Sequence, residues 1–216
     1  LFIGILFANI LLLFGMMMTP LLSNYQKKIV NNMIAKCQYM LNVPEDEEEE
    51  EEETDSEENK LTLMGVLQKI LTPSLETKTE GAEKFCVYSL KNMPKNRDGE
   101  SITIYGILDD SQYVDIDFKD EGVYLSDGLA EKYNIHIGDE LTLKEPYADD
   151  TYTFKVTGTY DYPAALAVFM PIQEYRNTFD KAEDYFNGYF SNEEIKDIDE
   201  QYIATTITED DLTKVS

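Results

Sequence analysis

The chain has 216 residues, and its 43 acidic side chains outnumber its 18 basic ones, which gives a formal net charge of −25. Twelve of the acidic residues fall between Glu45 and Glu58, and without that segment 31 acidic residues still face 18 basic ones, a net charge of −13. This balance excludes nucleic-acid binding through a basic surface and disfavours docking onto anionic lipid.

A long apolar segment opens the chain. No charged side chain occurs from Leu1 to Leu22, and the first charge of either sign is Lys27. About 20 helical residues, each rising roughly 1.5 Å, cross the roughly 30 Å hydrocarbon core of a bilayer. The segment lacks the basic start and the small-residue cleavage site of a secretory signal. We therefore expect residues 1–28 to form a transmembrane helix and a stalk, with the helix beginning before Leu1.

Residues 29–207 are expected to form a folded domain outside the membrane, interrupted by a charged insertion. Apolar and polar residues alternate from Cys37 to Val43, which predicts a strand. Residues 45–59 include nine consecutive acidic side chains, and like charges at this density repel one another and stay solvated. This segment is therefore interpreted as a disordered surface loop. The helical spacing of apolar residues at 63–71 predicts a short amphipathic helix after it.

Two strands joined by a turn are predicted between residues 84 and 108. In the first strand, 84–91, Phe85 and Val87 share one face, while Cys86, Tyr88 and Leu90 share the other. The second strand, 101–108, is rich in Ile, Thr and Tyr, which favour strands.

Residues 122–143 give the most detailed local prediction. A short strand at 123–125 leads to Ser126, which is expected to cap a helix that ends near Tyr133. Asn134 suits the left-handed position that closes a helix. The remaining elements of this segment are a strand at 135–137, a turn at Gly138 and Asp139, and a strand at 141–143.

The rest of the domain alternates between strands and helices. The predicted elements are a long antiparallel strand with one solvated face at 151–160, a buried strand at 166–170, a helix from Pro171 that carries Ile172, Tyr175 and Phe179, and strands at 184–190 and 202–207.

Two capping boxes, in which a Ser or Thr precedes an acidic residue by three positions, predict helix starts. Ser191 with Glu194 opens a helix before the last strand. Thr208 with Asp211 opens another after it, and we expect residues 208–216 to begin a helix that returns to the membrane.

No residues match a catalytic, metal or cofactor site, so we expect no enzyme activity in this chain. His136 is the only histidine, and its place between two isoleucines of a predicted strand favours a structural role. Asp115, Asp117 and Asp120 before Gly122 do not match a calcium loop, because a lysine occupies the fifth position. No glycine-rich phosphate loop is present.

The two cysteines, Cys37 and Cys86, leave two interpretations open. A disulfide between them is chemically permissible outside the cell. Two buried thiols are the alternative, because two cysteines alone do not make a disulfide framework.

Three segments carry a family resemblance. They are GVYLSDGLAEKYNIHIGDELTLK at 122–144, KVTGTYDY at 155–162 and AVFMPIQEY at 167–175. Together with the preceding apolar span, they resemble the extracytoplasmic domain of the FtsX/MacB-like ABC transporter permeases. The closing segment, from FNGYFSNEEI to ITEDDLTKV, is similar to the Gram-positive version of that domain.

The resemblance implies a two-lobed α+β domain of helices and antiparallel sheet, placed between the first two spans of a permease in the cell membrane. It implies that residues 109–162 form a lobe inserted into a membrane-proximal lobe made by 84–108 and 166–207. It further implies a separate ATP-binding subunit as partner, a permease dimer in membrane lipid, and a peptide, lipoprotein or protein as the exported or recruited molecule.

Three functions therefore remain. The first is a permease subunit whose outside domain transmits ATP-driven motion to export or partner recruitment. The alternative is a single-span, surface-anchored binding or sensor protein with an acidic outside domain. A membrane-tethered hydrolase is the least favoured, because no residues support it.

Overall fold

The computed structural model describes residues 2–31, 33–43, 75–92, 99–118, 122–209 and 211. The expected surface loop at 45–59 and the expected helix at 63–71 lie outside these residues. Where it is described, the chain forms an α+β domain with a mixed sheet after one N-terminal helix. The predicted fold class is confirmed.

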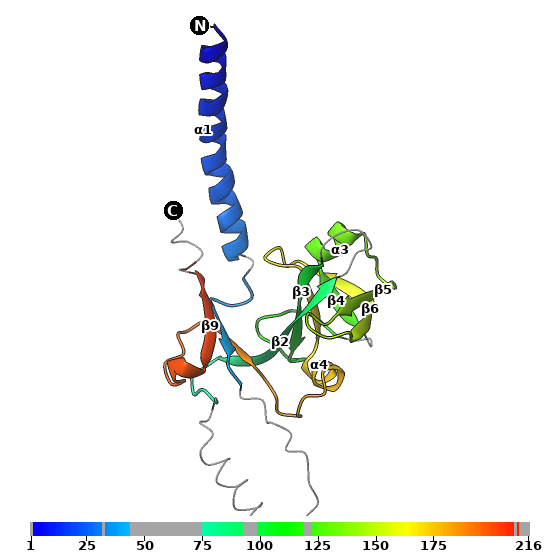
Figure 1. Ribbon diagram of the computed structural model, residues 1–216. Coiled ribbons are helices and arrows are strands. Elements are labelled where there is room, and N and C mark those ends of the chain that lie inside the picture. The colour runs from blue at the N-terminus through cyan, green and yellow to red at the C-terminus, as the bar shows by residue number, and fades with distance from the viewer. Residues whose placement is uncertain are drawn as a thin grey trace, which may run out of the picture.

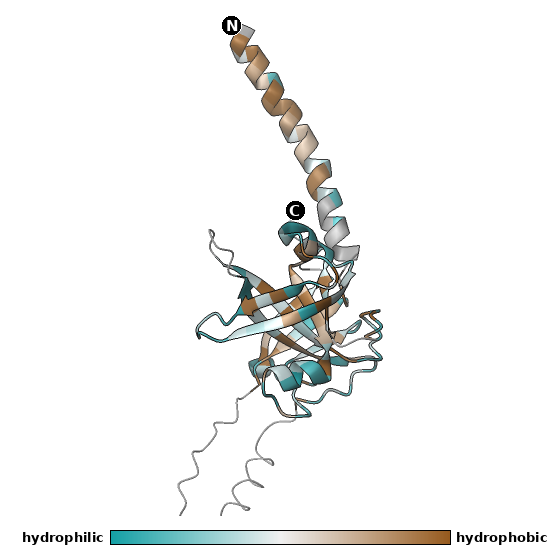
Figure 2. Cartoon of the chain, turned by 90° about the vertical axis from the view of Figure 1, so that its right-hand side faces the viewer, coloured by the Kyte–Doolittle hydropathy of each residue, from teal (hydrophilic) through white to brown (hydrophobic). Residues whose placement is uncertain are grey.

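The N-terminal helix α1 runs from Phe2 to Asn31 and stands away from the rest of the chain (Figure 1). Its segment Ile3–Asn24 is long and apolar enough to cross a membrane, and no part of it is buried against the protein. Figure 2 shows this segment as a mostly hydrophobic rod. Pro20 lies within the helix without ending it.

Six strands close into a barrel. They are β2 (Glu83–Asn92), β3 (Glu100–Ile107), β4 (Val123–Ser126), β5 (Glu140–Lys144), β6 (Thr151–Tyr160) and β7 (Ala167–Pro171). They pair in the order β2-β3-β7-β4-β6-β5, and pairing of Lys91 with Lys144 joins β5 back to β2. The pairs β3–β7 and β4–β6 are parallel, so the sheet is mixed rather than antiparallel throughout. Closing the sheet leaves few exposed edges.

The barrel interior holds the main hydrophobic core. Each strand contributes alternate apolar side chains to it: Cys86 and Leu90, Ile102 and Ile104, Val123 and Leu125, Leu141 and Leu143, Phe154 and Val156, Val168 and Met170. Helix α3 (Asp127–Tyr133) packs Leu129 and Ala130 against this core. Helix α4 (Ile172–Thr178) adds Ile172 and Tyr175 from the other end of the barrel (Figure 1).

The outer faces of β2, β3 and β7 are buried as well. Phe85 stacks on Phe190 with ring centres 4.0 Å apart, and Tyr105 stacks on Phe169 at 5.3 Å. Residues 109–118 cover these rings with apolar side chains that include Val114 and Ile116. Burial on both faces explains why β7 has a continuous apolar run rather than an alternating one.

A smaller antiparallel sheet lies beside the barrel. It contains β1 (Cys37–Leu41) between β8 (Gly188–Ser191) and β9 (Ile203–Thr208), and the 3₁₀-helix η1 (Glu200–Tyr202) precedes β9. Strand β8 also pairs with the first residues of β2. The ten-residue strand β2 therefore belongs to both the small sheet and the barrel.

The segment 109–162, expected as an inserted lobe, supplies α3, β4, β5 and β6 to the barrel. These strands share one core with β2, β3 and β7, which lie outside the segment. The boundary between the barrel and the small sheet runs along β2.

Two local predictions around α3 are wrong. Ser126 occupies the N-cap position but makes no capping hydrogen bond, because its buried hydroxyl accepts the backbone N–H of Ala167 at 3.0 Å. Residues 135–137 do not form the predicted strand, and His136 is exposed, whereas the chain does turn at Gly138 as predicted. Asn134 does adopt the predicted left-handed conformation, with φ 52°.

The helix predicted after Ser191 is also absent from the described structure. The Ser191 hydroxyl accepts the N–H of Glu193 at 3.1 Å, which forms a local turn. The N–H of Ile195 donates to the Tyr39 hydroxyl at 3.0 Å instead of entering a helix. Ile195 and Ile198 are buried against the small sheet, so tertiary packing overrides the capping signal here.

Candidate functional site

The small sheet joins the domain to helix α1 (Figure 1). Cys37, at the start of β1, pairs with Thr208, at the end of β9. One residue further on, the N–H of Glu209 donates to the carbonyl of Lys36 at 3.0 Å. The chain therefore enters the domain after α1 and leaves it after β9 at adjacent points, on the side where α1 stands (Figure 1).

The capping box predicted at Thr208 is formed. The N–H of Asp211 donates to the Thr208 hydroxyl at 3.2 Å. In return, the Asp211 carboxylate accepts the N–H of Thr208 at 3.2 Å and its hydroxyl at 2.7 Å. This reciprocal arrangement satisfies backbone donors at a helix start.

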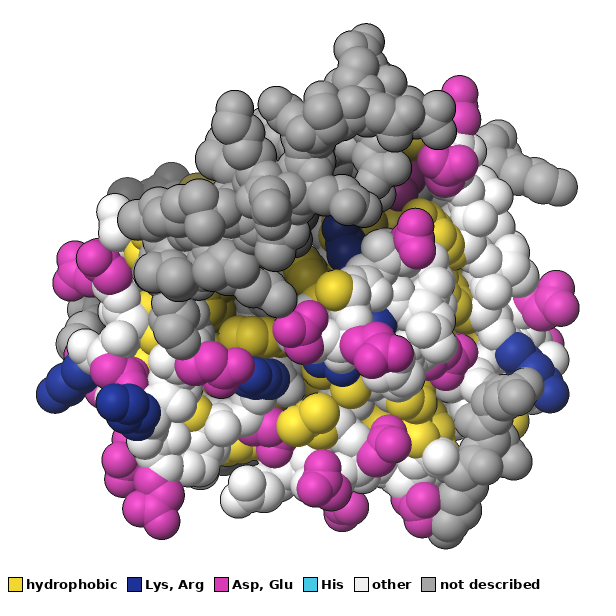
Figure 3. Space-filling view, turned by 90° about the horizontal axis from the view of Figure 1, so that it is seen from below, with side chains coloured by type: hydrophobic (Ala, Val, Ile, Leu, Met, Phe, Trp, Pro, Cys, Tyr) yellow, Lys and Arg dark blue, Asp and Glu magenta, His cyan; other side chains and the backbone are white. Residues whose placement is uncertain are grey.

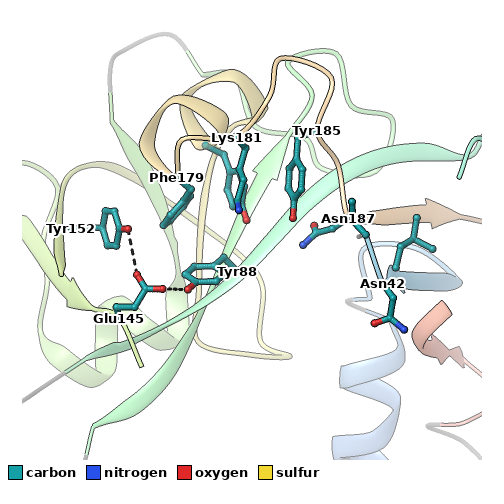
Figure 4. Close-up of a pocket in the computed structure, with 11 residues that line it drawn as sticks. Asn42, Tyr88, Glu145, Tyr152, Phe179, Lys181, Tyr185 and Asn187 are labelled. Carbon is teal, nitrogen blue, oxygen red and sulfur yellow. Dashed lines mark hydrogen bonds between the residues drawn. The ribbon is translucent and has the colours of Figure 1, made fainter. Parts of the chain in front are cut away.

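A cleft of about 470 Å³ lies between the barrel and the small sheet. It is lined by Leu41, Asn42, Val43, Tyr88, Glu145, Tyr152, Tyr175, Phe179, Lys181, Tyr185 and Asn187. These residues come from the end of β1, from β2, β6 and α4, and from the segments that follow β1, β5 and α4. Figure 4 shows Glu145 at one end of this group and Asn42 at the other.

Glu145 is fixed by two tyrosines. Tyr88 donates its hydroxyl to one carboxylate oxygen of Glu145, and Tyr152 donates to the other at 3.3 Å (Figure 4). Burial raises the pKa of Tyr152, and the nearby Glu145 carboxylate raises it further. The Tyr152 hydroxyl therefore stays protonated at neutral pH and remains a donor to the carboxylate.

Phe179 brings the aromatic side chains of the cleft together. Its ring centre lies 5.2 Å from that of Tyr88, 5.0 Å from that of Tyr152 and 4.7 Å from that of Tyr175. The chain after α4 is held in place because the guanidinium Nε of Arg176 donates to the carbonyl of Tyr185 at 2.8 Å.

Asn187 links the two parts of the domain at the other end of the cleft. Its side-chain oxygen accepts the N–H of Val87 at 2.7 Å, and its side-chain nitrogen donates to the carbonyl of Val87 at 2.8 Å. Its own carbonyl accepts the N–H of Leu41 at 2.8 Å. One residue therefore bonds both β2 and β1, which fixes the width of the cleft.

The residues that the sequence analysis considered for chemistry do not meet in one place. Cys37 and Cys86 are not joined by a disulfide. Cys37 is half-buried in the small sheet, and Cys86 is buried in the barrel. His136 Nδ1 lies 3.6 Å from the carboxylate of Asp139, and both side chains are exposed. No group of three or more His, Cys, Asp and Glu side chains among the described residues could hold a metal ion.

No sequence pattern predicted that these residues would form a cleft. Tyr88 and Tyr152 lie in predicted strands, and the strand propensity of tyrosine explains their presence but not their convergence. The one available signal was local: Glu145 interrupts the alternation at the end of β5, immediately before a turn that contains the fully exposed Tyr147. The other lining residues come together only through the pairing of distant strands.

Comparison with solved structures gives matches to this chain. No protein-family model matches the chain, and no curated protein matches it. Among solved structures, the crystal structure of the periplasmic region of MacB from Actinobacillus actinomycetemcomitans is similar over 84% of this chain and 91% of that chain. The sequence identity is 11% and the TM-score is 0.36.

Proposed function

We propose that the chain is the first span and the extracytoplasmic domain of a permease subunit in an ABC-type transporter complex of the cell membrane. In this proposal a separate subunit binds and hydrolyses ATP, and the chain itself is not an enzyme. The domain outside the membrane would transmit ATP-driven motion to the export of a peptide, lipoprotein or protein, or to the recruitment of a partner. A permease dimer and the Gram-positive type remain predictions of the sequence resemblance.

The pairing of β1 with β9 carries this proposal. Because Lys36 and Glu209 are hydrogen bonded, the two ends of the domain lie side by side next to the end of α1. The capping box at Thr208 and Asp211 supports a helix start at that point. A domain inserted between two neighbouring membrane spans needs this arrangement of its ends.

The arrangement also suits transmission of motion. A conformational signal requires two states whose balance a ligand shifts. If two spans tilt relative to each other when ATP binds, the paired ends of β1 and β9 receive that displacement directly. Because β1 and β9 are paired over several residues, the displacement passes along both strands into the rest of the small sheet.

The deciding experiment is purification of the intact gene product from its native membrane with an affinity tag. We expect an ATP-binding subunit to be retained in the purified complex, and a second span to follow Ser216. A tagged membrane protein of similar abundance is the control for nonspecific retention. An intact product with a single span and no bound ATPase would contradict the proposal and favour the surface-anchored sensor.

The orientation is tested separately by cysteine labelling. Tyr147 is fully exposed, so Tyr147→Cys in a Cys37→Ser background places an accessible thiol on the domain while Cys86 stays buried. We expect a membrane-impermeant maleimide to label this variant in intact cells or spheroplasts. Labelling that requires lysis of the membrane would place the domain in the cytosol.

A further inference from the structure

The Glu145 carboxylate lacks a cationic partner in the described structure. It is half-buried, and among the described residues no Lys, Arg or His nitrogen lies within 4.0 Å of it. Two tyrosine hydroxyls occupy only part of the roughly four acceptor positions of a carboxylate. A partly desolvated charge without a counter-charge is unfavourable, and a cation in the cleft would relieve this cost.

The lysine that precedes Glu145 in the chain and the lysine in the cleft wall are both engaged elsewhere. Lys144 pairs with Asp149 at 2.7 Å. Lys181 lies with its Nζ 5.4 Å from the centre of the Tyr185 ring. In Figure 4 Lys181 lies beside Tyr185, away from Glu145. Neither lysine therefore neutralises the Glu145 carboxylate.

The aromatic rings favour the same kind of ligand. Tyr88 and Tyr152 both donate their hydroxyls to Glu145, and the rings of both pack on Phe179, so three aromatic rings line the cleft beside the carboxylate. A cation over an aromatic face is attracted by the negative face of the ring. The domain already contains this contact elsewhere, because the Lys84 Nζ lies 4.3 Å from the centre of the Phe186 ring.

The charge around the cleft adds long-range attraction. Asp180, Glu183 and Asp184 flank Lys181 in the segment after α4, and all three carboxylates are exposed. Figure 3 shows the face opposite α1, where acidic side chains are spread among exposed hydrophobic ones. A negative field of this kind raises the local concentration and the association rate of cations.

From these observations we propose that the cleft binds a basic peptide, with a lysine or arginine side chain of the peptide seated between Glu145 and the rings of Tyr88, Tyr152 and Phe179. The cleft continues from Glu145 to Asn42, so a ligand that fills it extends beyond a single ammonium group (Figure 4). Its volume of about 470 Å³ lies within the range of ligand-binding clefts. This binding does not depend on the transporter assignment.

The test measures binding of a defined peptide to the whole chain in phosphatidylcholine nanodiscs by isothermal titration calorimetry. The probe is acetyl-Gly-Phe-Lys-Phe-Gly-amide, and the matched peptide carries norleucine in place of lysine. We expect saturable binding of the lysine peptide and a dissociation constant about tenfold higher for the norleucine peptide, which corresponds to about 1.4 kcal/mol. Equal affinities, or no saturable binding of the lysine peptide, would overturn the proposal.

Variants locate the binding in the cleft. Glu145→Gln keeps an acceptor for the tyrosines but removes the charge, and we expect it to weaken lysine-peptide binding about tenfold. Glu131→Gln makes the same change on the exposed surface of α3 and is expected to leave affinity within about twofold. Equal weakening by both would mean that net charge alone attracts the peptide, which contradicts a site at Glu145. Thermal unfolding of each variant checks that it is folded, and the norleucine comparison needs no variant.

Discussion

Gly106 lies where β3 meets α4, and this close approach leaves no room for a side chain. A Cβ atom at this position would lie 2.7 Å from the Cβ of Tyr175 and 3.2 Å from the Cβ of Cys86. Both neighbours are attached directly to backbone and cannot swing away. The closeness allows α4 to seat Tyr175 in the end of the barrel.

We predict that Gly106→Ala lowers the free energy of unfolding by about 1–3 kcal/mol, the usual cost of overpacking a core. Urea denaturation of the purified protein measures this change. Gly128→Ala is the matched control, because a Cβ there meets nothing within 4 Å and the position is helical. It should leave stability unchanged or raise it by up to about 1 kcal/mol. An unaffected Gly106→Ala protein would show that α4 is not seated as described.

The two cysteines differ in reactivity for a physical reason. Burial in the barrel raises the pKa of the Cys86 thiol to about 12, whereas Cys37 is only half-buried. Since the thiolate is the nucleophile, Cys86 has almost no reactive form at neutral pH. We predict that Ellman's reagent modifies Cys37 in the folded protein and Cys86 only after denaturation. Quantitative release of two equivalents without denaturant would contradict this prediction.

At the scale of secondary structure, Asn187 acts as a short extension of β8. Its side chain forms two hydrogen bonds with Val87, and its backbone bonds Phe85 and Leu41. We predict that Asn187→Ala lowers the free energy of unfolding by about 1–3 kcal/mol, because the partly buried backbone groups of Val87 lose their partners. Asn192→Ala is the control, since Asn192 makes one long, exposed hydrogen bond of 3.4 Å to the N–H of Lys36. Similar losses for both variants would show that Asn187 is not a specific link.

Local sequence signals predicted most elements of the described structure. Alternation gave β1, β2, β5 and β6 and correctly assigned Phe85 and Cys86 to opposite faces. Of the two capping boxes, the one at Thr208 is formed, whereas the one at Ser191 does not begin a helix. Thr208 caps as predicted by exchanging hydrogen bonds with Asp211, whereas the Ser126 hydroxyl bonds Ala167 on another strand. Local patterns fail where a distant partner offers the same polar group a better-placed hydrogen bond.

The barrel and the cleft could not be predicted in this way. Closure depends on the parallel strand pairs β3–β7 and β4–β6 and on the pairing of β2 with β5 at Lys91 and Lys144. All of these pairings join residues far apart in the chain. Glu145, Tyr88 and Phe179 are likewise brought together only by that closure. The local sequence accounts for the presence of each of these residues, but only the fold shows that they line the same cleft.

At the scale of the whole molecule, buried tyrosines make stability sensitive to high pH. Burial raises the pKa of Tyr162 and of Tyr175 in the folded state above the ordinary tyrosine value. The folded state therefore holds these protons more tightly than the unfolded state. Their contribution to stability is fully present below the unfolded-state pKa of about 10 and is lost as the pH rises above it.

We therefore predict that these tyrosines leave the free energy of unfolding unchanged between about pH 7 and pH 9 and lower it above about pH 10. Urea denaturation at a series of pH values measures this, and ultraviolet titration of the 15 tyrosines should show a late-ionising fraction. A single ionisation step near the ordinary value with constant stability would contradict the described burial.

The shortness of β1 has a mechanical consequence. Its first residue, Cys37, lies six positions after the end of α1, and its last residue, Leu41, already forms part of the cleft wall. Five extended residues span only about 17 Å, and hydrogen bonds to β8 and β9 on both sides prevent this rod from bending alone. A displacement of Cys37 is therefore carried along the strand to Leu41, in the wall of the cleft.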